Sequence, residues 1–129
     1  MAARGGRLFL ARRQAGGELS RRWEFPGGKC RDEESLQGCL EREFLEELEI
    51  SIQAGEEIGS VPFEHRGVAY QLVALTVTME GEPQVLHVHE EAGWFTEEEV
   101  VALDLADSDR QLFDRFRSRF RELLRRSSE

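Results

Sequence analysis

Two glycines followed by a glutamate-rich helix constrain this chain more than any other stretch. The segment GGKCRDEESLQGCLEREFLEELE runs from residue 27 to 49, and its last nine residues hold five glutamates. An apolar residue recurs every fourth position, which predicts a helix from about Ser35 to Leu48 with one apolar stripe; the stripe consists of Leu36, Leu40, Phe44 and Leu48. Like charges packed this closely destabilise a helix unless something neutralises them.

Three of these glutamates are predicted to lie on one face of the helix. At about 100° per residue, Glu43, Glu46 and Glu47 share roughly a third of the circumference. Convergent carboxylates either raise one another's pKa or bind a hard divalent cation such as magnesium, manganese or calcium. A solvated acidic face is the alternative interpretation.

The residues around the acidic face favour the cation over a solvated surface. Gly27 and Gly28 allow a tight turn and a close approach of the backbone, which would bring a main-chain carbonyl to the same ion. Arg42 stands beside the carboxylates and could orient one of them or meet a phosphate.

Length and charge narrow the classes of function. The chain has 129 residues, which predicts one domain over residues 1–129, and a formal net charge of −9. That charge disfavours a nucleic-acid polymer as partner, and a polyphosphate ligand would have to arrive with cations. No apolar run has the length of a membrane span or signal-peptide core, so we expect a cytoplasmic protein without a membrane partner.

Cys30 and Cys39 show no zinc-binding spacing and no disulfide framework, which predicts buried or idle thiols.

The remaining pattern predicts an α+β fold. Alternation predicts a strand over 7–13, and Pro26 with two glycines ends a second one over 23–29. Residues 68–79 are apolar on both alternating faces, as in a central strand of a covered sheet. Two shorter strands are predicted over 84–88 and 93–95.

Helices are predicted in the C-terminal part of the chain. Thr96 and Glu99 form a capping-box pattern, which opens a short helix through about Ala102. One continuous amphipathic helix is then expected over 107–126, with its seven arginines as a solvated outer face.

The spacing of the glycines and glutamates resembles the Nudix box over residues 28–50. The matching positions are Gly28, Glu34, Arg42, Glu43, Glu46, Glu47 and Ile50. Outside the box, LFLARR, WEFPGGK, HEEAGWF and the last helix resemble the MutT-like branch of that family. The resemblance implies a mixed β-sheet sandwiched between α-helices. It also implies Mg²⁺-dependent hydrolysis of a nucleoside diphosphate linked to another moiety.

The same resemblance assigns roles within the box. The Gly28 carbonyl, Glu43, Glu46 and Glu47 would hold Mg²⁺, with Mn²⁺ as an alternative, while Glu34 and Arg42 would brace the loop and helix. In MutT-like proteins water attacks the β-phosphorus of a nucleoside triphosphate, releasing the monophosphate and pyrophosphate.

Four residues outside the metal set are candidates for substrate contact. Arg13 and Lys29 could meet phosphates or could be surface cations. Phe25 could line a base pocket or lie in the core. Asp109 matches a position that faces the base edge in MutT-like proteins, where an ionised carboxylate would accept from guanine or cytosine N–H groups. Alternatively, Asp109 or its neighbours at 107 and 108 could cap the last helix.

The chain departs from the family pattern at three places. Glu49 replaces a glycine just past the helix, so the helix could end differently. Val88 stands where related enzymes often carry a glutamate, which leaves the general base open among Glu43, Glu46 and Glu90. His89 is expected to be a solvated loop residue. The family usually has another stretch of strand before ARGGRLFLARR, so either this strand is shortened here or the recorded start omits residues.

Three functions are compatible with this pattern. The first is a pyrophosphohydrolase of nucleoside triphosphates such as 8-oxo-dGTP or CTP, acting as a monomer or homodimer. The second keeps the chemistry but uses ADP-ribose or a dinucleoside polyphosphate. The third is a catalytically silent nucleotide-binding module, and the retained box glutamates favour an enzyme over it.

Overall fold

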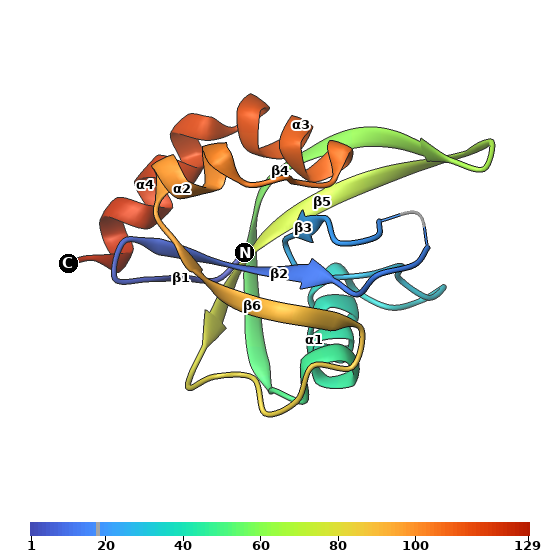
Figure 1. Cartoon of the computed structure of the whole chain (residues 1–129), viewed down its shortest axis with the longest axis horizontal. Coiled ribbons are helices and arrows are strands. Elements are labelled where there is room, and N and C mark those ends of the chain that lie inside the picture. The colour runs from blue at the N-terminus through green and yellow to red at the C-terminus, as the bar shows by residue number, and fades with distance from the viewer. Residues whose placement is uncertain (18) are drawn as a thin grey trace.

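The computed structural model describes residues 1–17 and 19–129 and shows two sheets flanked by helices (Figure 1). Its elements in chain order are β1 (Ala3–Arg4), β2 (Arg7–Arg13), β3 (Trp23–Glu24), α1 (Leu36–Leu48), β4 (Ile52–His65), β5 (Val68–Met79), β6 (His89–Phe95), α2 (Glu97–Ala102), α3 (Asp107–Arg115) and α4 (Arg117–Ser127).

The strand β2 organises the first sheet. It pairs antiparallel with β1, β3 and β6, and its pairing with β6 is irregular between Arg12 and Arg13. β4 and β5 form a long antiparallel hairpin. A parallel bridge from Ala2 to Val77 joins the N-terminal segment to this hairpin, so parallel and antiparallel pairing both occur.

Helices cover the strands on two sides, with α1 on one and α2, α3 and α4 on the other (Figure 1). Alternate residues of β2 supply the two cores, because successive side chains of a strand point to opposite faces. Leu8 and Leu10 pack in the core that contains Phe113 and Phe120 of the C-terminal helices, whereas Phe9 packs with Phe44 of α1. The predicted α+β sandwich is confirmed.

Two N-caps, of which the one at Thr96 was predicted, explain where two helices begin. The Ser35 side chain accepts a hydrogen bond from the Gly38 amide at the start of α1, and Thr96 and Glu99 form the complete capping box of α2. Glu49 ends α1 at φ 49° in the left-handed region. The helix therefore ends in the conformation that a glycine would favour, at some conformational cost to a glutamate.

Several predicted elements differ from the structure. Residues 84–88 form no strand, and β6 begins only at His89. The last helix is interrupted at Phe116, which separates α3 from α4. Val68–Met79 is a strand, but its first half is largely exposed and it belongs to a two-stranded sheet rather than a covered centre. The long strand β4 was not predicted. Within the described residues no helix is long and apolar enough to cross a membrane.

Candidate functional site

The backbone at Gly28 lies directly against the Glu43 carboxylate of α1. A Cβ atom at Gly28 would fall 2.4 Å from Glu43 Cδ and 2.5 Å from its Oε2. A Cβ there would force the Glu43 carboxylate, the flexible end of its side chain, to move away, so glycine permits this close approach. The glycine turn and the acidic helix therefore meet as the box pattern predicts.

Arg42 holds the loop after Gly28 against α1. Its Nε and Nη2 donate to the two oxygens of Glu34 at 2.6 and 2.9 Å, and Nη2 also donates to the Lys29 carbonyl at 3.1 Å. Its Nη1 donates to Glu43 at 2.8 Å and to Glu46 at 3.2 Å. The hydrogen bonds from Arg42 and from the Arg31 amide lower the pKa of Glu34 to about 2. We call Arg42, Glu34, Glu43 and Glu46 the Arg42 cluster.

The three box glutamates occupy different environments. Glu43 is largely buried, Glu46 is half exposed and turned toward Arg42 and Arg31, and Glu47 is partly buried. Burial raises the pKa of Glu47 to about 7; the charge of Arg13 opposes this, and repulsion by Glu24 and Glu43 adds to it. Among the described residues, no three His, Cys, Asp or Glu side chains are arranged to hold a metal ion.

A second charged cluster lies buried between β2, β3 and β6. Glu24 is 6% exposed and its Oε1 lies 2.6 Å from Arg13 Nε and 2.9 Å from His89 Nε2. His89 is 1% exposed, so the expectation of a solvated loop histidine was wrong. It is buried because the first residue of β6 pairs with Arg13 inside the sheet. We call Glu24, Arg13 and His89 the Glu24 cluster; the electrostatic effects on Glu47 connect it to α1.

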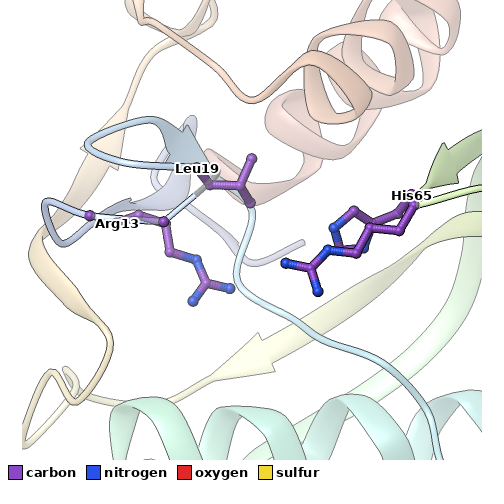
Figure 2. Close-up of a pocket in the computed structure, with 6 residues that line it drawn as sticks. Arg13, Leu19 and His65 are labelled. Atoms are coloured by element: carbon purple, nitrogen blue, oxygen red, sulfur yellow. The ribbon is translucent and has the colours of Figure 1, made fainter.

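A cavity opens where Arg13 reaches the edge of the sheet. It has a volume of about 310 Å³ and is lined by Arg13, Gly16, Gly17, Leu19, His65 and Arg66. Figure 2 shows Arg13 and Leu19 on one side of the cavity and His65, at the end of β4, on the other. A cavity lined by such basic side chains suits an anionic ligand.

The other predicted contact residues are distributed around the two clusters. Lys29 is exposed, and its Nζ lies 4.9 Å from the centre of the Tyr70 ring. Phe25 is buried and stacks on Phe120 with ring centroids 5.7 Å apart. It therefore belongs to the core, as one of its two interpretations had it.

Asp109 lies in the first turn of α3 but does not cap the helix. The N-cap is Ala106, which makes no side-chain capping bond. Asp109 Oδ1 accepts a hydrogen bond from the Phe25 amide at 3.0 Å. Burial raises the pKa of Asp109 to about 7, while the bond from Phe25 partly opposes that shift. The Asp109 side chain therefore links the first turn of α3 to Phe25, which lies just before the glycine turn.

Glu90 makes a different set of contacts from the box glutamates. Its Oε1 lies 3.0 Å from Arg21 Nε and 3.3 Å from Arg12 Nε. These partners belong to β2 and the loop that follows it. The carboxylate of Glu90 is thus neutralised by two arginines.

The two cysteines form a disulfide, which corrects the expectation of idle thiols. Cys30 in the box loop is bonded to Cys39 of α1, with Cα atoms 5.2 Å apart. The spacing of nine residues gives no hint of this bond. It forms because the loop folds back along the first turns of the helix.

Sequence reasoning missed two further functional candidates, Glu24 and His65. Glu24 is the residue before Phe25 in the segment WEFPGGK, and a charged residue inside a strand that leads into the core was a usable signal. His65 offered none, because only the long β4–β5 hairpin brings it opposite Arg13.

The donor chemistry at the acidic face suits a hard divalent cation, although the described carboxylates are not gathered around one point. Glu47 Oε1 is a buried oxygen without a hydrogen-bond partner, and Gly28 keeps the backbone beside Glu43 free of a side chain. All of these donors are oxygens, as Mg²⁺ and Mn²⁺ prefer. An unsatisfied buried acceptor costs free energy that a cation would recover.

Comparison with known proteins agrees with this geometry. The model of the NUDIX domain matches residues 1–116. CTP pyrophosphohydrolase of Escherichia coli (strain K12) is 34% identical over 113 residues, covering 88% of this chain and 84% of that protein. The solution structure of the E. coli ORF135 protein superposes with a TM-score of 0.80 at 34% identity, covering 92% of this chain and 84% of that one.

A second solved structure extends the similarity. The crystal structure of the MutT protein from Methanosarcina mazei Go1 has a TM-score of 0.75 at 26% identity, over 92% of this chain and 88% of that one. The box residues, the sandwich fold and the family match agree. The chain therefore belongs to the Nudix family of pyrophosphohydrolases.

Proposed function

We propose that the protein is a Mg²⁺-dependent pyrophosphohydrolase that converts a nucleoside triphosphate into the monophosphate and pyrophosphate. The observation that carries this proposal is the contact between the Gly28 backbone and Glu43, next to the unpaired buried oxygen of Glu47. The relative named CTP pyrophosphohydrolase supports a triphosphate substrate. CTP is accordingly the first candidate, and 8-oxo-dGTP is a second.

The metal-holding residues are proposed to be Gly28, Glu43, Glu46 and Glu47. Bound there, Mg²⁺ would neutralise phosphate charge and lower the pKa of a coordinated water. An acidic protein with a net charge of −9 needs such neutralisation to accept a polyanion. Mn²⁺ suits the same oxygen donors.

Arg42 and Glu34 are proposed to hold this face in position. The guanidinium is bonded to Glu34 through two nitrogens and to the Lys29 carbonyl, so it fixes the glycine loop relative to α1. Because Arg42 also donates to Glu43 and Glu46, it orients both carboxylates. Such preorganisation is worth more in catalysis than a flexible charge would be.

Glu46 is the proposed general base. It is half exposed and contacts Arg42 at 3.2 Å, so water reaches it while its carboxylate stays oriented. Glu90 is a weaker candidate because Arg12 and Arg21 already neutralise it. A base must lie within hydrogen-bond reach of the attacking water.

The cavity beside Arg13 is the proposed binding site for part of the substrate. Arg13, held by Glu24, would meet phosphate oxygens there, and Lys29 would do so from the glycine loop. Asp109 is proposed to read the base, since it lies against the strand that enters the loop. An ionised carboxylate would accept from the amino group of cytosine.

The experiment is a substrate panel with product identification. CTP, dCTP, dGTP, 8-oxo-dGTP, ADP-ribose and a diadenosine polyphosphate are incubated with the protein in Mg²⁺ or in EDTA. Release of pyrophosphate and monophosphate from a triphosphate, abolished by EDTA and by Glu46→Gln, would support the proposal. Turnover of ADP-ribose or the diadenosine polyphosphate alone would show that the substrate is not a nucleoside triphosphate. Binding without turnover of any compound would indicate a catalytically silent module.

A further inference from the structure

The disulfide joins the two parts of the metal-holding face that must stay together. Cys30 lies in the loop between Gly27 and Glu34, which contains no helix or strand, and Cys39 lies in α1 one turn before Glu43. The loop carries Gly28, and the helix carries the glutamates. A covalent bond between them limits how far Gly28 can move from Glu43.

Arg42 connects the disulfide to the charged side chains. Its Nη2 lies 4.0 Å from Cys39 Sγ and donates to the Lys29 carbonyl, one residue before Cys30. Its Nη1 donates to Glu43. Movement of the loop at Cys30 would therefore change the position of Arg42 and, through it, of Glu43.

Neither cysteine belongs to the two hydrophobic cores of the fold. Small domains that need disulfides are those that cannot build a sufficient core. This chain has two cores on opposite sides of β2, and the bond closes only a short segment, so it constrains the unfolded chain less than a bond that closes a long loop would. Stability of the whole domain is thus a poor explanation for the bond.

The two sulfurs differ in accessibility. Cys30 is exposed, whereas Cys39 is 2% exposed against the core. An external thiolate can reach the Cys30 sulfur from solvent, which is the requirement for thiol–disulfide exchange.

We propose that the Cys30–Cys39 disulfide is a reversible redox clasp that controls how firmly the glycine loop is held against α1. A dithiol reductant attacks Cys30 through one thiolate, which breaks the bond to Cys39 and forms a mixed disulfide. Its second thiolate then releases Cys30. Two electrons and two protons pass from the dithiol to the protein, leaving two cysteine thiols and an oxidised dithiol; oxidation by a small disulfide reverses the exchange.

Reduction removes one of the tethers between loop and helix. The polar contacts that remain between loop and helix include the bonds from Arg42 to Glu34 and to the Lys29 carbonyl, and the ion pair of Arg31 with Glu46. The loop then opens more often, and Gly28 and Glu43 meet for a smaller fraction of the time. The effect on turnover rests on the proposed function, whereas the effect on the loop does not.

The test compares oxidised and dithiothreitol-reduced protein, with the thiols counted by mass spectrometry after alkylation. Amide hydrogen exchange of residues 27–34 is measured without metal, and the Mg²⁺ concentration for half-maximal CTP hydrolysis is measured separately. Reduction should speed exchange in this loop about tenfold while leaving β2 and β6 unchanged. It should raise the half-maximal Mg²⁺ concentration about threefold or more. Reoxidation should reverse both changes.

Two variants provide matched controls, because the chain has only these two cysteines. Cys30→Ser and Cys30→Ser with Cys39→Ala should behave as the reduced protein and should not respond to dithiothreitol. If one variant folds poorly, the other and the reduced wild type still decide the result.

Three results would overturn the proposal that the disulfide controls the loop. These are equal loop exchange in both redox forms, a rise in exchange across the whole domain, and two free thiols in protein exposed to oxidant. Failure of the proposed function looks different: reduction would loosen the loop, but neither redox form would hydrolyse any triphosphate.

Discussion

The Arg42 cluster and the Glu24 cluster both pair an arginine with glutamate, but the first braces a loop against a helix and the second lies between strands and includes a histidine. Arg42 and Glu34 lie near the surface, and their hydrogen bonds lower the pKa of Glu34 to about 2. Beside the Glu24 cluster, burial raises the pKa of Glu47 to about 7. Arg42 donates hydrogen bonds to Glu34, whereas Arg13 acts on Glu47 only through its charge, so hydrogen bonding sets the direction of the first pKa shift and burial sets that of the second.

The difference suggests that the two clusters have different roles. The Arg42 cluster holds a loop without secondary structure, so its contacts matter most for the geometry of the site. The Glu24 cluster is enclosed by three strands, and its contacts matter most for stability. Substitutions in the two clusters should therefore change different observables.

The largest effect is expected where the Arg42 cluster meets the backbone. Gly28→Ala would place a Cβ against Glu43 and displace its carboxylate, lowering kcat/KM for the best substrate about a hundredfold. Gly27→Ala is the matched control, because a Cβ there would lie 3.4 Å from Leu40 Cδ1, an ordinary contact. Steady-state kinetics of both folded variants measure this, and equal losses would remove the special role of Gly28.

Substitutions in the Glu24 cluster should lower the free energy of unfolding. Glu24→Gln removes the charge that neutralises Arg13 and should lower the free energy of unfolding by about 2 kcal/mol, less than for a fully buried pair because Arg13 is partly exposed. Urea unfolding of metal-free protein measures this loss. Glu90→Gln serves as control, since the more exposed Glu90 pairs should contribute about 1 kcal/mol or less. Equal losses would contradict the comparison.

A smaller effect on activity is expected from Arg42→Lys. The lysine keeps the charge but cannot bond Glu34, Lys29 and Glu43 at once, so kcat/KM should fall about tenfold with little change in unfolding. Arg31→Lys is the control, because Arg31 contacts Glu46 only at 3.5 Å. A loss of stability without loss of activity would assign Arg42 to folding instead.

The last prediction concerns the dependence of stability on pH. The pKa of Asp109 is raised in the folded state from 3.8 to about 7. Folded protein therefore binds more protons than unfolded protein between these values, and stability decreases as pH rises from about 4 to 7. Asp109→Asn keeps an acceptor for the Phe25 amide without the charge.

This substitution should leave stability at pH 4 nearly unchanged and raise it at pH 8 by at most about 4 kcal/mol, the linkage energy of a pKa shift from 3.8 to about 7. Unfolding curves of metal-free wild type and variant across this range measure the difference. An identical pH slope in the two proteins would show that Asp109 titrates at its ordinary value.

The sequence predicted those parts of the fold that depend on local chemistry. The boundaries of α1 follow from the Ser35 cap and the apolar stripe, and those of α2 from the Thr96 capping box. The break between α3 and α4 at Phe116 could not be predicted from the local sequence, because it reflects packing between distant parts of the fold. A Cβ at Gly59 of β4 would lie 2.6 Å from the Phe116 ring, so this ring packs on a bare strand backbone.

The candidate site likewise has contacts that the sequence predicts and contacts that it does not predict. The Gly28–Glu43 contact and the brace by Arg42 lie within a single stretch of sequence, where the spacing of residues sets the geometry. The Glu24 cluster assembles residues from three strands, and the cavity adds the far end of the β4–β5 hairpin. Such contacts depend on strand register, which the motif does not encode.

The most direct test of the central claim is a Mn²⁺ titration followed by electron paramagnetic resonance. Wild-type protein, Glu43→Gln, Glu47→Gln and the control Glu90→Gln are compared without substrate. The account predicts a Mn²⁺ site in wild type and Glu90→Gln whose affinity falls at least about tenfold in each box variant. Unchanged Mn²⁺ binding in folded Glu43→Gln and Glu47→Gln would contradict the assignment of the metal to this face of α1.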